Sequence, residues 1–342
     1  MVSKAPIELV DTTNMSRADW LEWRKKGVGG SDLAAIMGMS PWATARDIYR
    51  EKRKIPIALK EKIERANWVE KEIGHRLESL VAEIFAHKTG LKPYPVRKMF
   101  AHPDYPFMIA NVDYLVDLPD GRTAILECKK TNARLKDEWV DGAIPMHYEL
   151  QGRHYMVVMN VDVVFTACLY GNSEKEFEWL RFDRDMDFEA DIIDTEKNFW
   201  LNHVVPGIEP PYTEKGDLVL QSIRNFYGNA DTTAPTVLLP SDMFQSIETY
   251  LILKEEKAQL EQMLKALDNK VKKAQAVFIE KMGTACKAIC KNGDNEIVIT
   301  YNPVNKESVS KDALRAAHPG IYAEFFHTKE SHRLLSVKKK SA

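Results

Sequence analysis

The chain has 342 residues, of which 44% are hydrophobic and 29% charged, and its formal net charge is −2. This composition is typical of a folded globular protein, and the length allows about two domains. A nearly neutral total excludes DNA binding through overall positive charge, although a local basic groove remains compatible with it. The sequence contains no apolar run of about 18 residues and no N-terminal signal peptide. The four cysteines lack the spacing of a zinc site. We therefore expect a cytoplasmic protein that does not enter a membrane.

Residues 16–50 are expected to form two helices separated by glycines. Two of these glycines and Ser31 lead into the second helix, which should begin near Asp32. Backbone amides at this point, together with the Ser31 hydroxyl and Arg24, would suit a phosphate group. A glycine-rich turn in which Ser31 only caps the helix explains the same pattern. From these residues alone, the simple cap is the better explanation.

Residues 68–90 carry the clearest amphipathic pattern of the chain, which predicts a long helix that ends at Gly90. Glu78 falls at the border of its apolar stripe, and Gly74 lies one turn earlier, which leaves space above the carboxylate. A border glutamate usually extends into solvent. The position alone therefore does not identify Glu78 as a ligand.

Two antiparallel strands are expected at residues 107–117 and 123–131, because apolar segments flank a turn that contains Pro119 and Gly121. Side chains alternate along a strand with a period of two. Ala124, Leu126 and Cys128 should therefore face one side of the sheet, and Ile125, Glu127 and Lys129 the other.

This alternation brings Glu127 and Lys129 beside Asp113 on the neighbouring strand. Two carboxylates and an ammonium in an apolar hairpin are costly unless they are paired or bound to a metal. Asp113, Glu127 and the Cys128 carbonyl are oxygen ligands of the kind that Mg²⁺ prefers. A surface ion pair is the alternative, because Glu-x-Lys also occurs at Glu255, on a stretch expected to be a solvated helix.

The following segment predicts a helix at residues 145–160, strands at 161–170 and 176–182, and a helix at 185–203. Together with the helix and hairpin before it, this order indicates an α/β sandwich, in which helices flank a mixed central sheet.

The C-terminal part differs in pattern from this core. We expect a domain at residues 1–215, a linker at 216–240 and a long helix or coiled-coil arm at 241–283. A small α+β segment of unassigned role should follow at 284–342. An amphipathic helix lying back on the core is the alternative to the coiled-coil arm.

Five short motifs occur in one order along residues 16–200. They are Trp20-x₃-Arg24-x₆-Ser31-Asp32, Gly74-His-Arg-Leu-Glu78, Asp113, Glu127-Cys-Lys129 and Tyr148-x₂-Gln151. This ordered set resembles the YqaJ-type viral recombinase (phage lambda exonuclease) family. The resemblance implies the α/β core of the PD-(D/E)xK nucleases, which are restriction-endonuclease-like.

The resemblance also implies roles for individual residues. Asp113 and Glu127 match the metal-binding carboxylates, and Lys129 matches the catalytic lysine. Glu78 matches a helix carboxylate that helps to hold the metal, and Gln151 matches a glutamine that positions the active site. We expect the Cys128 carbonyl to complete the ligand set for Mg²⁺, with Mn²⁺ as a substitute.

Arg24 and Ser31 match residues that grip the 5′-phosphate of a DNA end. Two departures weaken this part: Asn111 stands where the family has a phosphate-contacting serine, and Arg134 only approximates the position of an arginine. A basic run offers further candidate phosphate contacts, although a solvated helix face explains it equally well. The run consists of Arg46, Arg50, Lys52, Arg53 and Lys54.

The resemblance implies a Mg²⁺-dependent deoxyribonuclease that digests linear double-stranded DNA from the 5′ end and leaves 3′ overhangs. A single-strand annealing protein would use these overhangs in phage-type recombination, in a bacterial or phage-infected cell. The family also suggests a homo-oligomeric ring around DNA. The alternatives are an endonuclease or single-strand nuclease on the same core, and a DNA-binding recombination accessory protein with an inactive site.

Overall fold

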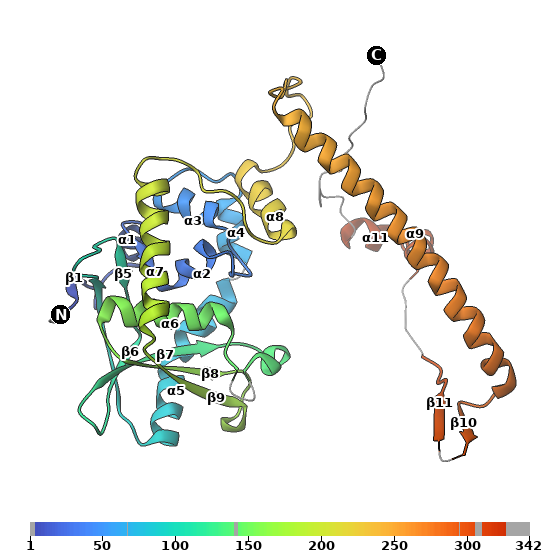
Figure 1. Ribbon diagram of the computed structural model, residues 1–342, viewed down its shortest axis with the longest axis horizontal. Helices are drawn as coiled ribbons and strands as arrows, with labels where there is room; N and C mark the ends of the chain where they lie inside the picture. Colours follow the sequence, from blue (N-terminus) through green and yellow to red (C-terminus); the bar gives the residue numbers. More distant parts are fainter. Residues whose placement is uncertain (1–3, 67, 140–142, 294, 305–309, 326–342) are drawn as a thin grey trace. The chain divides into compact units, whose positions relative to one another are not determined.

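The apolar strands expected from the sequence assemble into a mixed five-stranded sheet at the centre of the first part of the chain (Figure 1). Its strand order is β3-β6-β7-β8-β9. Strands β7 and β8 run parallel, and all other neighbours are antiparallel. The strands are β3 (Pro93–Pro95), β6 (Tyr114–Asp117), β7 (Thr123–Lys130), β8 (Val163–Leu169) and β9 (Phe177–Asp183). The predicted α/β fold with a mixed sheet is thus confirmed.

Helices cover both faces of this sheet. On one face, helix α5 (Trp68–Thr89) packs Val81 and Phe85 against a core that includes Leu126 and Phe165. On the other face, helix α6 (Met146–Met159) packs against a core that includes Ile125. The predicted alternation along β7 is therefore confirmed. It assigns the side chain of Cys128 to the α5 face.

A second, four-stranded sheet was not expected from the sequence. Its order is β1-β4-β5-β2, with β2 parallel to β5. The strands are β1 (Ile7–Asp11), β2 (Val28–Gly29), β4 (Lys98–Ala101) and β5 (Met108–Ala110). This sheet places the start of helix α2 (Gly30–Ile36) beside the strand that leads to Asn111 and Asp113.

The remaining elements of this part are mostly helical. They are α1 (Arg17–Arg24), α3 (Ala45–Lys52), α4 (Lys60–Ala66), α7 (Met186–Phe199), α8 (Gly216–Tyr227), the 3₁₀ helices η1 (Ala133–Glu138) and η2 (Glu174–Glu176), and the π-helical turn η3 (Trp200–Val204).

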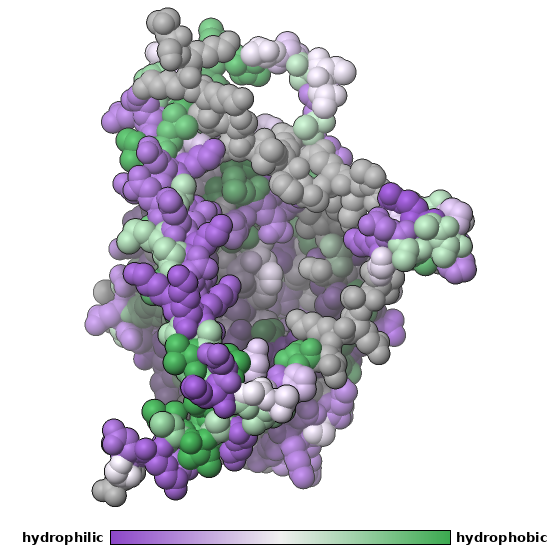
Figure 2. Space-filling view, turned by 90° about the vertical axis from the view of Figure 1, so that its right-hand side faces the viewer, coloured by the Kyte–Doolittle hydropathy of each residue, from purple (hydrophilic) through white to green (hydrophobic). Residues whose placement is uncertain are grey.

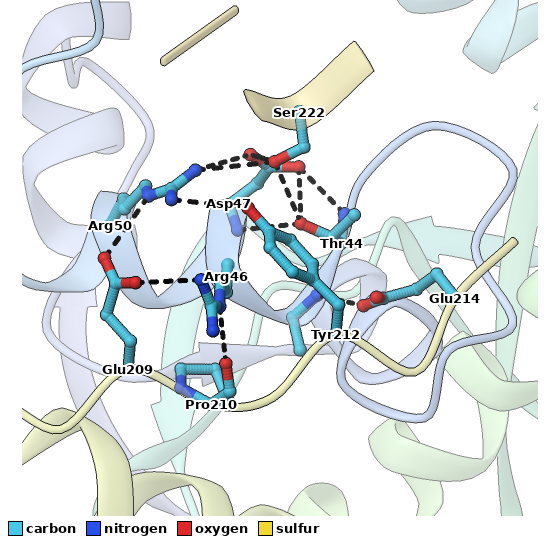
Figure 3. Close-up of polar contacts among 10 residues, drawn as sticks. Thr44, Arg46, Asp47, Arg50, Glu209, Pro210, Tyr212, Glu214 and Ser222 are labelled. Carbon is cyan, nitrogen blue, oxygen red and sulfur yellow. Dashed lines mark hydrogen bonds and ion pairs between the residues drawn. The ribbon is translucent and has the colours of Figure 1, made fainter. Parts of the chain in front are cut away.

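Helix α8 lies in the segment that the sequence analysis assigned to a linker. A polar network fixes α8 and the residues just before it to helix α3 (Figure 3). The Ser222 hydroxyl donates to Asp47 at 2.6 Å, and the backbone amide of Ala45 donates to Glu214 at 2.6 Å. The backbone amides of Ala58 and Leu59 donate to carbonyls near the end of α8. Residues 216–227 therefore belong to the first unit rather than to a connection between domains.

The computed structural model describes residues 4–66, 68–139, 143–293, 295–304 and 310–325. The chain divides into two units, Met1–Gly228 and Asn229–Ala342. Within the described ranges, no helix is both long and apolar enough to cross a membrane. Residues 326–342 of the predicted C-terminal segment lie outside them.

The second unit contains the long helix that the sequence predicts, followed by two paired strands and two short helices. They are α9 (Met243–Met282), the antiparallel strands β10 (Lys287–Asn292) and β11 (Asn295–Thr300), and the helices α10 (Lys311–Ala317) and α11 (Pro319–Phe325). No residue of α9 is buried, and Leu260, Leu264 and Leu267 remain exposed. Hydrophobic residues interrupt a largely hydrophilic surface on the face shown in Figure 2. A coiled coil formed by α9 stays a prediction.

Candidate active site

Three polar side chains from β7 and α6 form a closed set of hydrogen bonds. Lys129 Nζ donates to Glu127 Oε1 at 2.7 Å and to Gln151 Oε1 at 2.9 Å. Gln151 Nε2 donates to the same Glu127 oxygen at 2.7 Å and to the Tyr155 hydroxyl at 3.1 Å. The side chain of Glu127 is only 4% exposed, and that of Lys129 is 15% exposed. The sequence-predicted residues Glu127, Lys129 and Gln151 therefore lie together, and the surface ion pair is excluded.

Asp113 joins this group through the backbone of β7. Its Oδ2 accepts a hydrogen bond from the Cys128 amide at 3.0 Å. Burial and the nearby Glu127 and Glu78 carboxylates raise the pKa of Asp113 well above its usual range. Burial and Glu127 also raise the pKa of Glu78 on helix α5. The carboxylates near Asp113 and Glu78 thus disfavour the ionised forms of these two residues.

A hard divalent cation would relieve this repulsion. The donors have the right chemistry, since carboxylate oxygens are preferred ligands of Mg²⁺. Glu127 Oε2 is buried and has no hydrogen-bond partner among the residues that the structure describes, so it is available as a ligand. However, no three His, Cys, Asp or Glu side chains in the described part of the chain converge closely enough to enclose a metal ion. The donor atoms are therefore of the type that Mg²⁺ prefers, but in this structure the three side chains do not converge on one point.

A second cluster lies at the start of α2. Arg24 Nη2 donates to the Ser31 hydroxyl at 2.7 Å and pairs with Asp32 at 2.9 Å. Asp32 also accepts from the backbone amide of Gly29 and from Lys52 Nζ, at 2.9 and 2.7 Å. The side chain of Arg24 is 23% exposed. The structure therefore brings Arg24 and Ser31 together, with Arg24 held by a buried acid and still reached by solvent.

The other two candidate phosphate contacts behave differently. The Trp20 indole donates to Asn111 Oδ1 at 2.7 Å, and its ring lies 5.1 Å from the Arg24 guanidinium. Asn111 thus contacts the aromatic residue that supports Arg24. Arg134 is exposed on η1, and its guanidinium makes no ion pair with any described residue. The structure does not join Arg134 to either cluster.

The basic run on and after α3 is built into the fold. Lys52 is buried against Asp32. Arg50 is 2% exposed and lies over the Phe226 ring at 3.9 Å. Arg46 Nε donates to the Pro210 carbonyl at 2.6 Å (Figure 3). Lys54 is exposed and pairs with Glu22. Arg53 lies beside Gly207. For the buried residues Arg50 and Lys52, the interpretation as phosphate contacts and the interpretation as a solvated helix face are therefore both wrong.

The two clusters touch through a glycine that the sequence analysis treated only as part of a turn. A Cβ atom on Gly30 would lie 2.8 Å from the Tyr155 ring and 3.0 Å from Gln151 Cγ. Helix α2 therefore packs directly on Tyr155 and on Gln151, the residue that holds Lys129. The signal in the sequence was the four-residue spacing of Gln151 and Tyr155, which places both on one face of α6.

A buried His–Glu pair was also missed. His154 Nδ1 lies 2.6 Å from Glu196, and Nε2 donates to the Ile109 carbonyl at 2.8 Å. Both side chains are fully buried. Although burial opposes it, the Glu196 carboxylate raises the pKa of His154. This pair ties α6 and α7 to strand β5, and its only sequence signal was a histidine on an apolar helix face.

Comparison with known proteins relates the chain to one family. The profile of the YqaJ-like viral recombinase domain matches residues 19–162. Uncharacterized protein YqaJ of Bacillus subtilis (strain 168) is 31% identical over 275 residues, which cover 80% of this chain and 82% of that protein.

Two solved structures are more distant. An alkaline exonuclease from Laribacter hongkongensis is 20% identical, with a TM-score of 0.44 over 56% of this chain and 94% of that chain. A phage-related exonuclease from Haemophilus somnus 129PT is 12% identical, with a TM-score of 0.34 over 53% of this chain and 96% of that chain. The similarity to the Bacillus protein extends over most of both sequences, and the chain belongs to the YqaJ-like viral recombinase family.

Proposed function

We propose that the chain is a Mg²⁺-dependent deoxyribonuclease that digests linear double-stranded DNA from the 5′ end. One observation supports this proposal above all. Hydrogen bonds hold Glu127, Lys129 and Gln151 together, and Asp113 lies beside them. A carboxylate pair with a fixed ammonium is suited to phosphodiester hydrolysis, because that reaction needs positioning and charge neutralisation more than covalent participation.

Asp113, Glu127 and Glu78 would hold the cation, with the Cys128 carbonyl as a further ligand. When bound, the ion would polarise the phosphate and a water molecule as a Lewis acid. Lys129 would stabilise the negative charge that develops on the phosphoryl oxygens as water attacks phosphorus and the P–O bond to the leaving oxygen breaks. Gln151 holds Lys129 and Glu127 in a fixed relation.

Arg24 and Ser31 would bind the terminal 5′-phosphate and so direct the enzyme to DNA ends. Arg24 is suited to this role because its side chain is partly exposed and a guanidinium binds phosphate through several donors. The resulting 3′ overhangs would pass to a single-strand annealing protein. A homo-oligomer around the duplex would keep the enzyme on its substrate. These partners are proposed from family membership.

The test uses a linear duplex with 5′-phosphates and a closed circle of the same sequence, each incubated with the purified chain and Mg²⁺. The proposal expects loss of the linear duplex from its 5′ ends, an intact circle, and no reaction with EDTA. Mn²⁺ should substitute for Mg²⁺. Nicking of the circle would indicate an endonuclease, and binding without cleavage of either substrate would indicate the accessory protein.

The 5′-phosphate preference has its own test. Ser31→Ala removes the hydroxyl that contacts Arg24 and leaves the Arg24–Asp32 pair in place. We expect the ratio of cleavage rates on 5′-phosphate and 5′-hydroxyl ends to fall several-fold. Ser173→Ala, which changes a hydroxyl bonded to Glu176, serves as the matched control. An unchanged ratio in Ser31→Ala would assign the end-binding pocket to other residues.

A further inference from the structure

An exposed tryptophan lies next to the candidate active site and has no role in the proposed chemistry. Trp42 is 64% exposed, although large aromatic side chains usually bury most of their surface. Its ring meets the His147 ring edge to face, with centroids 4.6 Å apart and an interplanar angle of 80°. The indole thus contacts the protein through the His147 ring, and much of its surface remains open to solvent.

The loop that carries Trp42 is held in place by hydrogen bonds. The amides of Met39 and Ser40 both donate to the Ala34 carbonyl at the end of α2, at 2.8 and 2.9 Å. The Ser40 hydroxyl accepts from the amides of Trp42 and Ala43, at 3.2 and 3.3 Å. The backbone that carries Trp42 is therefore fixed, and the ring itself contacts His147.

An aromatic series connects this ring to the catalytic lysine. The Tyr148 centroid lies 4.1 Å from His147 and 6.3 Å from Trp42. Lys129 Nζ lies 4.8 Å from the centre of the same Tyr148 ring. Burial and the Lys129 charge lower the pKa of His147 to about 4, so its ring is neutral near pH 7. The indole thus rests on an uncharged aromatic surface that is two side chains from the lysine.

We propose that Trp42 is a stacking platform for an unpaired base of the DNA strand whose phosphate reaches Lys129. This inference rests on the proposed function, and it adds a substrate-binding residue outside the catalytic group. Successive phosphates of one strand are about 3.4 Å apart along the duplex axis, so the ring lies within a few nucleotides of the scissile phosphate. Aromatic platforms accept any base, because every base has a π-face.

A nucleobase suits this surface better than a protein partner does. The aromatic series continues into the hydrogen-bonded group of Lys129, so whatever covers Trp42 lies beside the reacting phosphate. A polynucleotide supplies a flat ring and a phosphate on one chain at this spacing. Stacking would hold the separated strand end in the site after its base pair opens.

The experiment measures DNA binding without cleavage in the full chain that carries Asp113→Asn. The probe is a duplex with 2-aminopurine at the first, second or third nucleotide from the 5′ end, whose fluorescence falls when the base stacks. The variants are Trp42→Ala, Trp42→Leu and Trp42→Phe. Leu keeps an apolar surface without a π-face, and Phe keeps a π-face.

We expect quenching at one position, its loss in Trp42→Ala and Trp42→Leu, and most of it retained in Trp42→Phe. Affinity should fall about ten-fold in the first two variants. With Asp113 restored, Trp42→Ala should raise KM by a similar factor and leave kcat within about two-fold. Unfolding temperatures should not change, because the side chain is mostly exposed.

Equal quenching in Trp42→Ala and the parent would overturn the platform. Equal losses in Trp42→Leu and Trp42→Phe would also overturn it, because they would not depend on a π-face. Unchanged DNA binding together with an altered oligomer mass in Trp42→Ala would instead identify a protein contact. The proposed function fails separately, if the chain with Asp113 restored binds the duplex but does not cleave it.

Discussion

At the residue scale, Asp113 is a candidate site residue whose charge is expected to lower the stability of the metal-free fold. Its carboxylate lies near Glu127 and Glu78, and burial together with these charges raises its pKa. Asp113→Asn removes one like charge and keeps a side-chain oxygen that can accept from the Cys128 amide. We expect the metal-free protein to unfold about 2–4 °C higher, which corresponds to about 1 kcal/mol at this size. Cleavage should fall at least about 100-fold.

Calorimetry and a cleavage assay on the same preparation check this prediction. Asp117→Asn on the same sheet is the control, because Asp117 is exposed and contacts Tyr94 and Thr123 at the surface. It should change neither quantity appreciably. A less stable Asp113→Asn protein would show that the carboxylate forms a favourable contact rather than a repulsive one.

The same raised pKa predicts competition between protons and Mg²⁺. Because the metal-free pKa of Asp113 lies well above 3.8, the site retains a proton at pH values where an ordinary aspartate is ionised. A cation must displace that proton, so its apparent affinity rises with pH through this window. The Mg²⁺ concentration that gives half-maximal cleavage should therefore decrease as the pH is raised. A concentration that does not change between pH 5.5 and 8.5 would contradict this mechanism.

At the element scale, the contact between α2 and α6 depends on Gly30. A methyl group there would overlap the Tyr155 ring and press on Gln151. We expect Gly30→Ala to lower the free energy of unfolding by about 1–3 kcal/mol. It should also reduce cleavage, because Gln151 holds both Lys129 and Glu127. Chemical denaturation and the cleavage rate measure the two effects.

Gly74→Ala is the matched control, since a Cβ atom at Gly74 meets no other atom within 4 Å. Gly74 lies inside helix α5, where alanine is favoured over glycine by about 0.5–1 kcal/mol. The two substitutions should therefore change stability in opposite directions. If Gly30→Ala left stability unchanged, the two helices would have room to separate, and the clusters would not be coupled through this contact.

The sequence predicts the long helices and strands of the structure better than the short ones. The helices that contain Glu78 and Gln151 and the strand that contains Glu127 were predicted, because long elements repeat their apolar pattern several times. The single strand expected at residues 107–117 was wrong: it divides into β5 and β6, which belong to different sheets, and Asp113 lies between them. Strands β2 and β5 have two and three residues, too few to show any period. The burial of Arg50 was also hidden, because its partners Tyr212 and Ser222 lie about 160–170 residues away.

At the scale of the whole molecule, the two units differ in how they are stabilised. Every buried side chain among the described residues belongs to the first unit, and so do all five hydrophobic clusters. The candidate active site and the Arg24 cluster lie there as well. Helix α9 has 40 residues and none of them is buried. The hydrophobic clusters of the first unit are therefore formed by residues of that unit.

A chain that ends after Gly228 tests this division. Because α8 is fixed to α3 by Ser222, the end at 228 retains contacts that an end at 215 would remove. We expect the shorter chain to unfold cooperatively within about 2–3 °C of the first unit in the full chain. Its rate of cleavage of a short duplex should stay within about three-fold of that of the full chain.

A chain that ends at 215 is the control and should be clearly less stable, since Arg50 would lose the Ser222 hydroxyl and the Phe226 ring inside the fold. If the chain of 228 residues failed to fold, the first unit would depend on contacts from the second, and the division at residue 228 would not be one of stability.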